Sequence, residues 1–390
     1  MFRKPPPSVP DFTQLDFGLQ AGIVHLNHGS FGTVPKPVQI AQHVWGERIE
    51  AGPTEWLGRR LDEIVGPARE AVAGLVNAAP ERLGLLTNAT AGVGAFLRSV
   101  SLKPGDEIVA IDHVYNAVRL YATVVAARAG ATFREVPLGL PVVGDASIVD
   151  TIMGGCSAKT RLLVIDHVTS PTALVLPVAQ LVGAARAAGI ACLIDGAHAP
   201  GMLPLDLTAL DADAYTGNLH KWCFAPRGSA FLSVSAACEQ WVRPETLSHN
   251  IHESFTRAFD WQGTRDFSAW GAIPAAIEYL RRGGPAQWMA HNHHMAVWAH
   301  AMLCEALGVE PISPVDGRLF GSMATVRLDQ RAARLHSTAA ALQERLFKEH
   351  RIEVPIVDWN GQWFVRLSAQ IYNRPEDYLG LAEALRKLCA

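Results

Sequence analysis

The sequence has no apolar run of the ~20 residues that a membrane-spanning helix needs, and it lacks a basic excess. Arg119, Arg128 and Arg186 interrupt its most apolar stretches. With 34 Lys and Arg against 37 Asp and Glu, its formal charge is -3 and its isoelectric point about 6.6. A nucleic-acid-binding surface is usually strongly basic. We therefore expect no membrane span and no nucleic-acid partner.

Cysteine is scarce, and its spacing fits no common framework. The six cysteines, at 156, 192, 223, 238, 304 and 389, include no C-x-x-C pair. In a chain of 390 residues this pattern is typical neither of a disulfide-rich domain nor of a zinc finger. The stretch from Met1 to Pro10 has two cations and four prolines but no apolar segment, unlike a signal peptide. We expect free thiols and a cytoplasmic protein.

The order of the apolar segments predicts an α/β fold. Hydrophobic residues make up 49% of the chain, enough for a sizeable core. Short continuous apolar runs alternate with helical segments, which is typical of a mostly parallel sheet covered on both faces. We expect a doubly wound seven-stranded sheet with strands at 83–86, 107–111, 132–136, 161–165, 191–194, 214–216 and 230–234.

The pattern changes after about residue 268. Two helical stretches, 269–280 and 286–307, precede expected strands at 323–328, 353–357 and 363–367. This order predicts a smaller α+β domain. We expect an N-terminal segment, 1–35, that packs with the small domain, a large domain over 36–265, and a small C-terminal domain over 266–390.

Three turns that follow expected strands carry polar residues, and ligands of open parallel sheets bind at such places. The first turn, 87–92, opens a helix and is either an anion site or an ordinary N-cap. Asp195 ends a central strand, where a buried carboxylate needs a cationic partner; we favour a ligand cation over a structural ion pair. Lys221 follows the next strand among aromatic and apolar neighbours, which would lower the pKa of its amine and make it a nucleophile.

Lysine is rare, which singles out Lys221. The chain has seven lysines, and the other six lie among prolines, in turns, at a strand start or in exposed-looking helices. An anion-binding turn, Asp195 and a lysine 26 residues later together suggest pyridoxal 5'-phosphate. The phosphate would lie at the helix N-terminus, Asp195 would pair with the pyridine nitrogen, and Lys221 would form the Schiff base.

Motifs spread over nearly the whole chain resemble those of a known family. They are HLNHGSFG at 25–32, DHVYNA at 112–117, DHVTSPT at 166–172, DGAHAPG at 195–201, HKW at 220–222, GTRD at 263–266 and RLSAQ at 366–370. In content and order they resemble class V aminotransferases of the fold-type I pyridoxal-phosphate enzymes, and within these the isopenicillin N epimerase-like branch. The resemblance implies the fold-type I transferase fold and this cofactor.

The resemblance also implies roles for single residues. Lys221 matches the Schiff-base lysine that moves the Cα proton, and Asp195 matches the partner of the pyridinium. Arg366 matches the arginine that binds the α-carboxylate of the substrate, for which a planar fork is suited. Thr264 matches a residue that reaches the phosphate in the other subunit, which implies a homodimer with shared active sites. Further positions match cofactor-binding residues: Ala89, Thr90, His198, Asn218 and His220.

Five further residues belong to loops that match the walls of the family's site. The segment with His113 and Tyr115 matches the loop that stacks on the cofactor ring, and we favour Tyr115 for the stacking. Ser170 stands where many relatives place an asparagine near the cofactor oxygen. Asn27 and His28 are expected to contact the substrate.

The sequence leaves the reaction on the expected α-amino acid open. Lys221 alone suffices for Cα deprotonation followed by β-elimination, and we favour a C–S lyase acting on an S-substituted cysteine. Epimerisation would need a second acid, for which Tyr115 or a histidine could serve, and transamination is a further alternative. A binding protein without catalysis is a remote one. A nicotinamide dehydrogenase is excluded because Gly92-Val93-Gly94 lacks the third glycine of the dinucleotide motif.

Two other features are given structural interpretations. Family members that form a persulfide carry a cysteine on a loop near the matching arginine, whereas here the next cysteine after Arg366 is Cys389. Desulfuration by that route is therefore not expected. The cluster at 291–294 contains three histidines, but only His291 and His294 share a side of a helix. We expect a polar helix face there and no metal site.

Overall fold

The computed structural model describes residues 17–389, and its centre is a seven-stranded sheet in the order β2-β8-β7-β6-β5-β3-β4. All strands run parallel except β8, which is antiparallel to both of its neighbours. This sheet confirms the α/β fold with a mostly parallel seven-stranded sheet. The strands are β2 (Leu83–Leu86), β3 (Glu107–Ile111), β4 (Thr132–Val136), β5 (Thr160–Asp166), β6 (Ala191–Asp195), β7 (Ala214–Asn218) and β8 (Ala230–Val234).

Helices cover both faces of this sheet. Successive side chains of each buried strand point to opposite faces, so each strand contributes to two cores. In β3, Val109 and Ile111 join one core, while Ile108 and Ala110 join the other. The first core also contains side chains of α4 (Asp62–Val76), α7 (Asp145–Gly154), α8 (Val178–Ala187), α11 (Ser268–Gly271) and α12 (Ile273–Arg282). The second contains side chains of α5 (Ala89–Ser99), α6 (Asn116–Arg128) and α10 (Phe255–Asp260).

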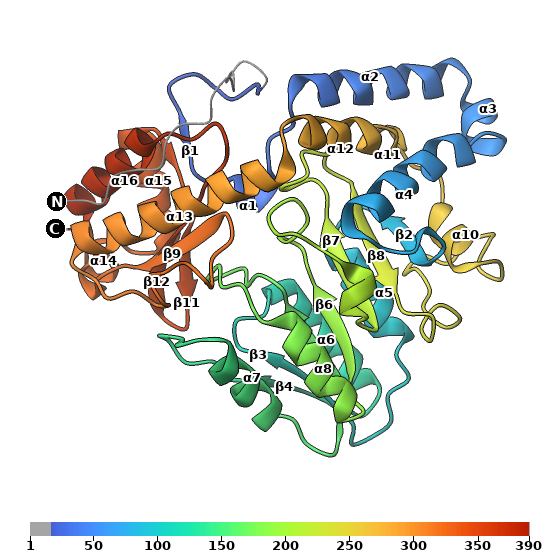
Figure 1. Ribbon diagram of the computed structural model, residues 1–390, viewed down its shortest axis with the longest axis horizontal. Coiled ribbons are helices and arrows are strands. Elements are labelled where there is room, and N and C mark those ends of the chain that lie inside the picture. The colour runs from blue at the N-terminus through green and yellow to red at the C-terminus, as the bar shows by residue number, and fades with distance from the viewer. Residues whose placement is uncertain (1–16, 390) are drawn as a thin grey trace.

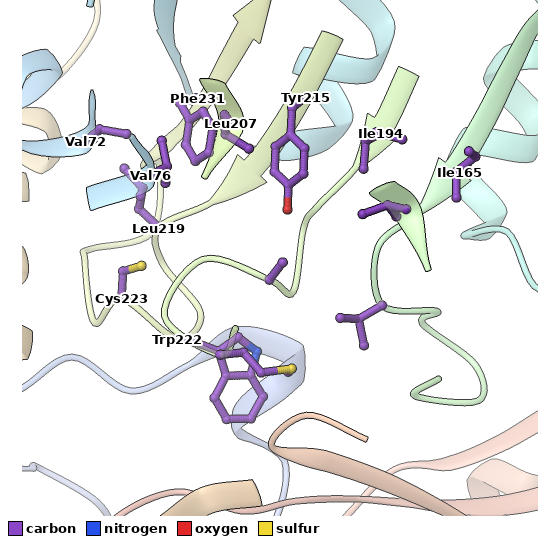
Figure 2. Packing of buried hydrophobic residues seen from close by; sticks show 14 of the residues in the cluster. Val72, Val76, Ile165, Ile194, Leu207, Tyr215, Leu219, Trp222, Cys223 and Phe231 are labelled. Atoms are coloured by element: carbon purple, nitrogen blue, oxygen red, sulfur yellow. The ribbon is translucent and has the colours of Figure 1, made fainter. Parts of the chain in front are cut away.

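The first core continues from the sheet into the loop that follows β7. Figure 2 shows Phe231, Tyr215 and Ile194 next to one another on three neighbouring strands, with Trp222 and Cys223 in that loop. Trp222 and Cys223 are both fully buried. The residues that flank Lys221 on its C-terminal side are thus fixed in the core, which holds the main chain of the loop in place.

A smaller unit follows in the C-terminal part of the chain. Its sheet has the antiparallel order β11-β12-β9, with β9 (Met323–Arg327), β11 (Ile356–Trp359) and β12 (Gln362–Ser368). The expected strand at 353–357 is two short strands, β10 (Ile352–Glu353) and β11, separated by Pro355, which has no N–H to donate. The long α13 (Pro285–Leu307) runs from beside α12 into this unit (Figure 1). Its other helices are α14 (Gln330–Leu335), α15 (Ala339–His350) and α16 (Pro375–Leu388).

The N-terminal segment lies against the small unit over part of its expected length. β1 (Val24–His25) pairs in parallel with β10, and Leu26 belongs to the core of the small unit. After α1 (His28–Phe31) the chain crosses to the large unit, where Val34 and α2 (Lys36–Ala51) pack. The large unit also contains α3 (Pro53–Gly58), the 3-10 turn η2 (Pro80–Arg82) and α9 (Leu207–Leu210), which contact α2, α4 and α8 respectively. The part of the predicted segment at 1–16 lies outside the described residues.

The border between the two units differs from the expected position at 265/266. Phe267, Trp270 and Ile273 are part of the large unit's core, because α11 and α12 pack on α2 and α4. The small unit therefore begins at α13. Within residues 17–389, no helix is both long and apolar enough to cross a membrane.

Candidate active site

The carboxyl edge of the large sheet contains a cavity of about 330 Å³. Its walls come from residues that end or follow β2, β3, β5, β6 and β7, from α1, and from β12 of the small unit. Parallel strands present their carboxyl ends at one edge, so residues far apart in sequence meet there. The residues predicted from the sequence that line this cavity are Ala89, Thr90, Tyr115, Ser170, Asp195, His198, Asn218, His220, Lys221 and Arg366.

Lys221 brings an amine with an unusual pKa into the cavity. Burial lowers this pKa from 10.5 to about 7, the positive charge of Arg366 adds to the effect, and the carboxyl groups of Asp195 and Asp166 oppose it. Nζ of Lys221 lies 3.2 Å from Nε2 of His198, whose own pKa is held well below 6.5 by burial. The lowered pKa therefore makes the neutral form of the Lys221 amine abundant near pH 7. The neutral amine is the form that attacks a carbonyl carbon or removes a proton.

Asp195 and Asp166 lie side by side on the cavity wall. They pair in register at the ends of β6 and β5, and both are buried. Asp195 accepts a hydrogen bond from the main-chain N–H of Ala197 at 2.9 Å, whereas Oδ2 of Asp166 has no hydrogen-bond partner among the described residues. Burial raises the pKa of both carboxyl groups, and the charge of Asp195 raises that of Asp166 further. This wall therefore favours a cationic group of a ligand.

Arg366 brings a guanidinium group from β12 of the small unit. Nη1 donates to the main-chain oxygen of Ser170 at 2.6 Å and lies 3.2 Å from its Oγ, and Nη2 donates to Oγ of Ser30 at 2.9 Å. Nε has no hydrogen-bond partner within residues 17–389. Burial lowers the pKa of this group to about 10, so it stays charged near neutrality. A buried guanidinium held only by hydroxyl and carbonyl oxygens is suited to bind the carboxylate of a ligand.

The start of α5 forms the opposite end of the cavity. Asn88 caps this helix by accepting the N–H of Ala91 at 2.9 Å, and Oδ1 of Asn218 accepts the N–H of Ala89 at 2.8 Å. Gly92 lies so close to Thr216 that a Cβ atom would collide with it, so glycine lets the helix approach β7. The main-chain amide of Ala89 is thus held by Asn218, and it reaches an anion only when this side chain turns away.

Four residues predicted for the site do not line the cavity. The ring of His113 is fully buried and bonded at both nitrogens, to Oγ1 of Thr172 at 2.7 Å and to the main-chain oxygen of Leu138 at 2.8 Å, and its role in cofactor binding stays a prediction. Tyr115, which is 44% exposed, lines the cavity instead. Thr264 is exposed and lines a separate hollow beside α3.

Asn27 and His28 do not line the cavity either, and their contact with the substrate stays a prediction. Both are buried beneath the cavity wall, where Nδ2 of Asn27 lies 3.5 Å from Glu353 and the ring of His28 bonds to Tyr372. Their neighbours Gly29, Ser30 and Phe31 line the cavity in their place. The cause is the short α1 turn, which directs the side chains at 27 and 28 inward.

Asp166 is the main residue that sequence reasoning missed. It ends β5 as Asp195 ends β6, and it opens one of the motifs used above. Its position at the end of a second buried strand could have identified Asp166 from the sequence. Asn88, which caps α5, also lines the cavity and was not among the predicted site residues.

The residues in the cavity fit pyridoxal 5'-phosphate. Lys221 has a partly neutral amine for the aldehyde carbon, Asp195 has a buried carboxylate for the pyridinium, and His198 has a buried ring nitrogen, Nδ1, without a partner among the described residues. The polar start of α5 is suited to the phosphate. The fold and this set of groups define a pyridoxal-phosphate enzyme of fold type I.

Comparison with known proteins identifies the family. The profile of the family described as Aminotransferase class-V matches residues 52–378, so the chain belongs to this family. It is 33% identical to an isopenicillin N epimerase of Amycolatopsis lactamdurans, over 95% of this chain and 96% of the other. It is 34% identical to a putative L-cysteine desulfhydrase 1 of Oryza sativa subsp. japonica, over 95% and 84% of the two chains. The predicted family, its isopenicillin N epimerase-like branch and the cofactor are thereby confirmed.

Solved structures confirm the fold. An apo cysteine desulfurase of Thermococcus onnurineus NA1 has a TM-score of 0.80 at 17% identity, over 99% of both chains. A complex of the cystine C-S lyase C-DES with its product cysteine persulfide has a TM-score of 0.79 at 22% identity, over 94% of this chain and 97% of the other. The chain is a pyridoxal-phosphate-dependent enzyme with the fold-type I architecture.

Proposed function

We propose that this enzyme catalyses β-elimination on a cysteine-type α-amino acid and breaks its Cβ–S bond. The observation that carries the proposal is the pairing, in one small cavity, of the Lys221 amine with the Arg366 guanidinium. The relatives named as L-cysteine desulfhydrases, which cover most of the chain, support it.

Substrate binding would depend on Arg366. Its Nε has no partner within the described residues, and its other nitrogens are oriented by Ser30 and Ser170. The guanidinium would bind the α-carboxylate and place Cα over the end of the cavity that Lys221 occupies. The bound cofactor supplies an electron sink that makes the Cα proton acidic.

The proton step would belong to Lys221. The neutral amine takes the proton from Cα, and the Cβ–S bond then breaks with its electron pair leaving on sulfur. The sulfur leaves as a thiolate that is protonated to a thiol, and the remaining three-carbon product takes up water to give pyruvate and ammonium. For cysteine the thiol is hydrogen sulfide. The lowered pKa of Lys221 suits it to act near neutral pH.

The position of the cysteines favours direct elimination over persulfide formation. No cysteine of the described part of the chain lines the cavity. Cys223 is close to Lys221 in sequence, but it is fully buried, and burial raises the pKa of its thiol well above the usual range. A thiol that stays protonated and shielded is a poor nucleophile.

The size of the cavity favours a small substrate. Ligand cavities span roughly 300 to 1,000 Å³, and the cavity of about 330 Å³ here lies at the small end of this range. A cavity at the small end of the range is suited to an amino acid with a small side chain, such as cysteine. A bulky side chain would have to extend past Phe31, which is 69% exposed at the rim.

Epimerisation is the second candidate function, and Tyr115 is the observation that favours it. Tyr115 is 44% exposed and belongs to the cavity wall, so its hydroxyl group could return a proton to Cα on a face that Lys221 does not reach. The relatives named as isopenicillin N epimerases support this alternative.

Proton NMR of the cofactor-loaded enzyme in heavy water, with cysteine, S-substituted cysteines and other amino acids, separates the two functions. Pyruvate and a released thiol would support elimination. Deuterium at Cα with loss of chirality and no keto acid would instead establish epimerisation. The Lys221→Ala variant, which lacks the base, is the matched control for background exchange.

The assembly and the location in the cell are further parts of the proposal. We propose a homodimer because Thr264 matches the family's phosphate-contacting residue yet lies outside its own subunit's cavity. We also propose a cytoplasmic enzyme, since its six cysteines are free thiols in the structure.

A further inference from the structure

His28 lies directly behind the cavity, between the large and small units. It opens α1, and its ring is fully buried against Trp222 and Tyr372, with ring centroids 5.0 and 5.8 Å away. Burial and the nearby His25 lower the pKa of this ring to about 3, although a bond to the main chain of Lys221 opposes the shift. The ring is therefore neutral at physiological pH and carries one N–H.

The link between His28 and Lys221 requires the tautomer with the hydrogen on Nε2. Nε2 lies 3.0 Å from the main-chain oxygen of Lys221, which can only accept, and 3.2 Å from the amide nitrogen of Gln370, which can only donate, so a neutral ring satisfies one of the two. With the hydrogen on Nε2, His28 donates to Lys221, and Nδ1 accepts the O–H of Tyr372, whose oxygen is 2.9 Å away. His28 thus ties the peptide of Lys221 to the loop that follows β12.

The same short segment also holds the guanidinium that would bind the substrate. Oγ of Ser30 accepts Nη2 of Arg366 at 2.9 Å, and the N–H of Gly29 donates to Oγ of Ser368 at 3.0 Å. Gly32 has a φ of +66°, and a Cβ atom there would collide with the main-chain oxygen of His220. Residues 28–32 therefore contact the main chain of His220 and Lys221, and they also form hydrogen bonds to residues of β12.

We propose that His28 is a positioning residue that sets the distance between the amine of Lys221 and the carboxylate-binding Arg366. Cα of a substrate is placed by Arg366, while the base that removes its proton is placed by the Lys221 main chain. A direct link between the two supports holds them at a fixed separation. The proposal rests on the proposed function, because it takes Lys221 as the base and Arg366 as the carboxylate clamp.

Two substitutions at the same position test the link. His28→Leu removes the donor to the Lys221 oxygen at similar volume, whereas His28→Gln keeps a side-chain N–H near the place of Nε2. Misplacing a reacting group by about 1 Å can cost roughly 100-fold in rate. His28→Leu should therefore lower the rate of Cα deuterium exchange roughly 10- to 100-fold at saturating substrate, with little change in KM. His28→Gln should recover most of this rate.

A matched control separates positioning from general stability. His336 is also buried, and its Nε2 is bonded to a main-chain oxygen, that of Leu388 at 2.9 Å, far from the cavity. His336→Leu should lower the melting temperature as His28→Leu does, but it should leave the exchange rate and the pH midpoint of the cofactor's visible absorbance unchanged. His28→Leu should displace that midpoint. An equal loss of exchange in His336→Leu would overturn the proposal.

Further results would also overturn it. One is a folded, cofactor-loaded His28→Leu enzyme that exchanges at the wild-type rate, and another is a His28→Gln enzyme as slow as His28→Leu. If His28→Leu does not fold, Tyr372→Phe takes its place, because it removes only the hydroxyl group that donates to Nδ1 of His28. A wild-type pH midpoint and a wild-type exchange rate in this variant would overturn the proposal. Neither the rate of Cα deuterium exchange nor the pH midpoint of the visible absorbance depends on cleavage of a C–S bond. A wild-type enzyme that exchanges Cα but releases no thiol therefore contradicts only the proposed function.

Discussion

The pKa of Lys221 is open to direct measurement in the cofactor-free enzyme. Capture of pyridoxal phosphate requires the neutral amine, so its rate should rise with pH and level off with a midpoint near 7. An amine with the usual pKa of 10.5 would be neutral in roughly one molecule in 3,000 at pH 7, whereas the lowered pKa of Lys221 makes its neutral form abundant there. The reaction is followed as the growth of visible absorbance after rapid mixing.

Charge-removing variants give the sign of each contribution. Arg366→Gln removes a positive charge that lowers the pKa, so its midpoint should rise, while Asp195→Asn removes a negative charge that raises it, so its midpoint should fall. A charge in the same buried cavity shifts a pKa by roughly one unit or more, which sets the expected size of both changes. Pyridoxal without phosphate controls for titration of the phosphate, and Lys221→Ala gives the background. A wild-type midpoint near 10, or two variants that move in the same direction, would refute the reasoning.

Four further outcomes are expected. Lys221→Ala should keep the circular dichroism of the wild type but lose the visible absorbance and Cα exchange; retained exchange would contradict its role as the base. Arg366→Lys should raise KM for the amino acid roughly 10- to 100-fold in initial-rate measurements, because a point charge replaces a planar fork, and an unchanged KM would count against the carboxylate clamp. Asp166→Asn should lower the midpoint for cofactor capture, because the charge of Asp166, like that of Asp195, raises the pKa of Lys221; an unchanged midpoint would show that Asp166 carries no charge. Sedimentation analysis should find a homodimer, and a fully active monomer would contradict the assignment of Thr264.

Local patterns in the sequence determined the α/β fold, the family and the central pair of site residues. All seven strands of the large sheet were located, and the inner ones are mostly apolar because they are buried on both faces. The edge strand β4 is only partly buried and carries Arg134 and Glu135. Lys221 and Asp195 could be identified because each follows or ends such a strand, and the carboxyl edge of a parallel sheet is where ligands bind. The border of the small unit was missed, since the apolar face of α12 does not reveal which core it joins.

Only the tertiary structure decided which loop residues enter the cavity. His113 and Tyr115 are two residues apart, yet the buried ring of His113 bonds to Thr172 and Leu138 while Tyr115 lines the cavity. Asp166 meets Asp195 because β5 and β6 are neighbours in a set register, and Arg366 arrives from a strand about 145 residues after Lys221. The direction of a side chain in a turn depends on partners that are remote in the chain. The sequence therefore determined the chemistry of the site, and the packing of distant segments determined its geometry.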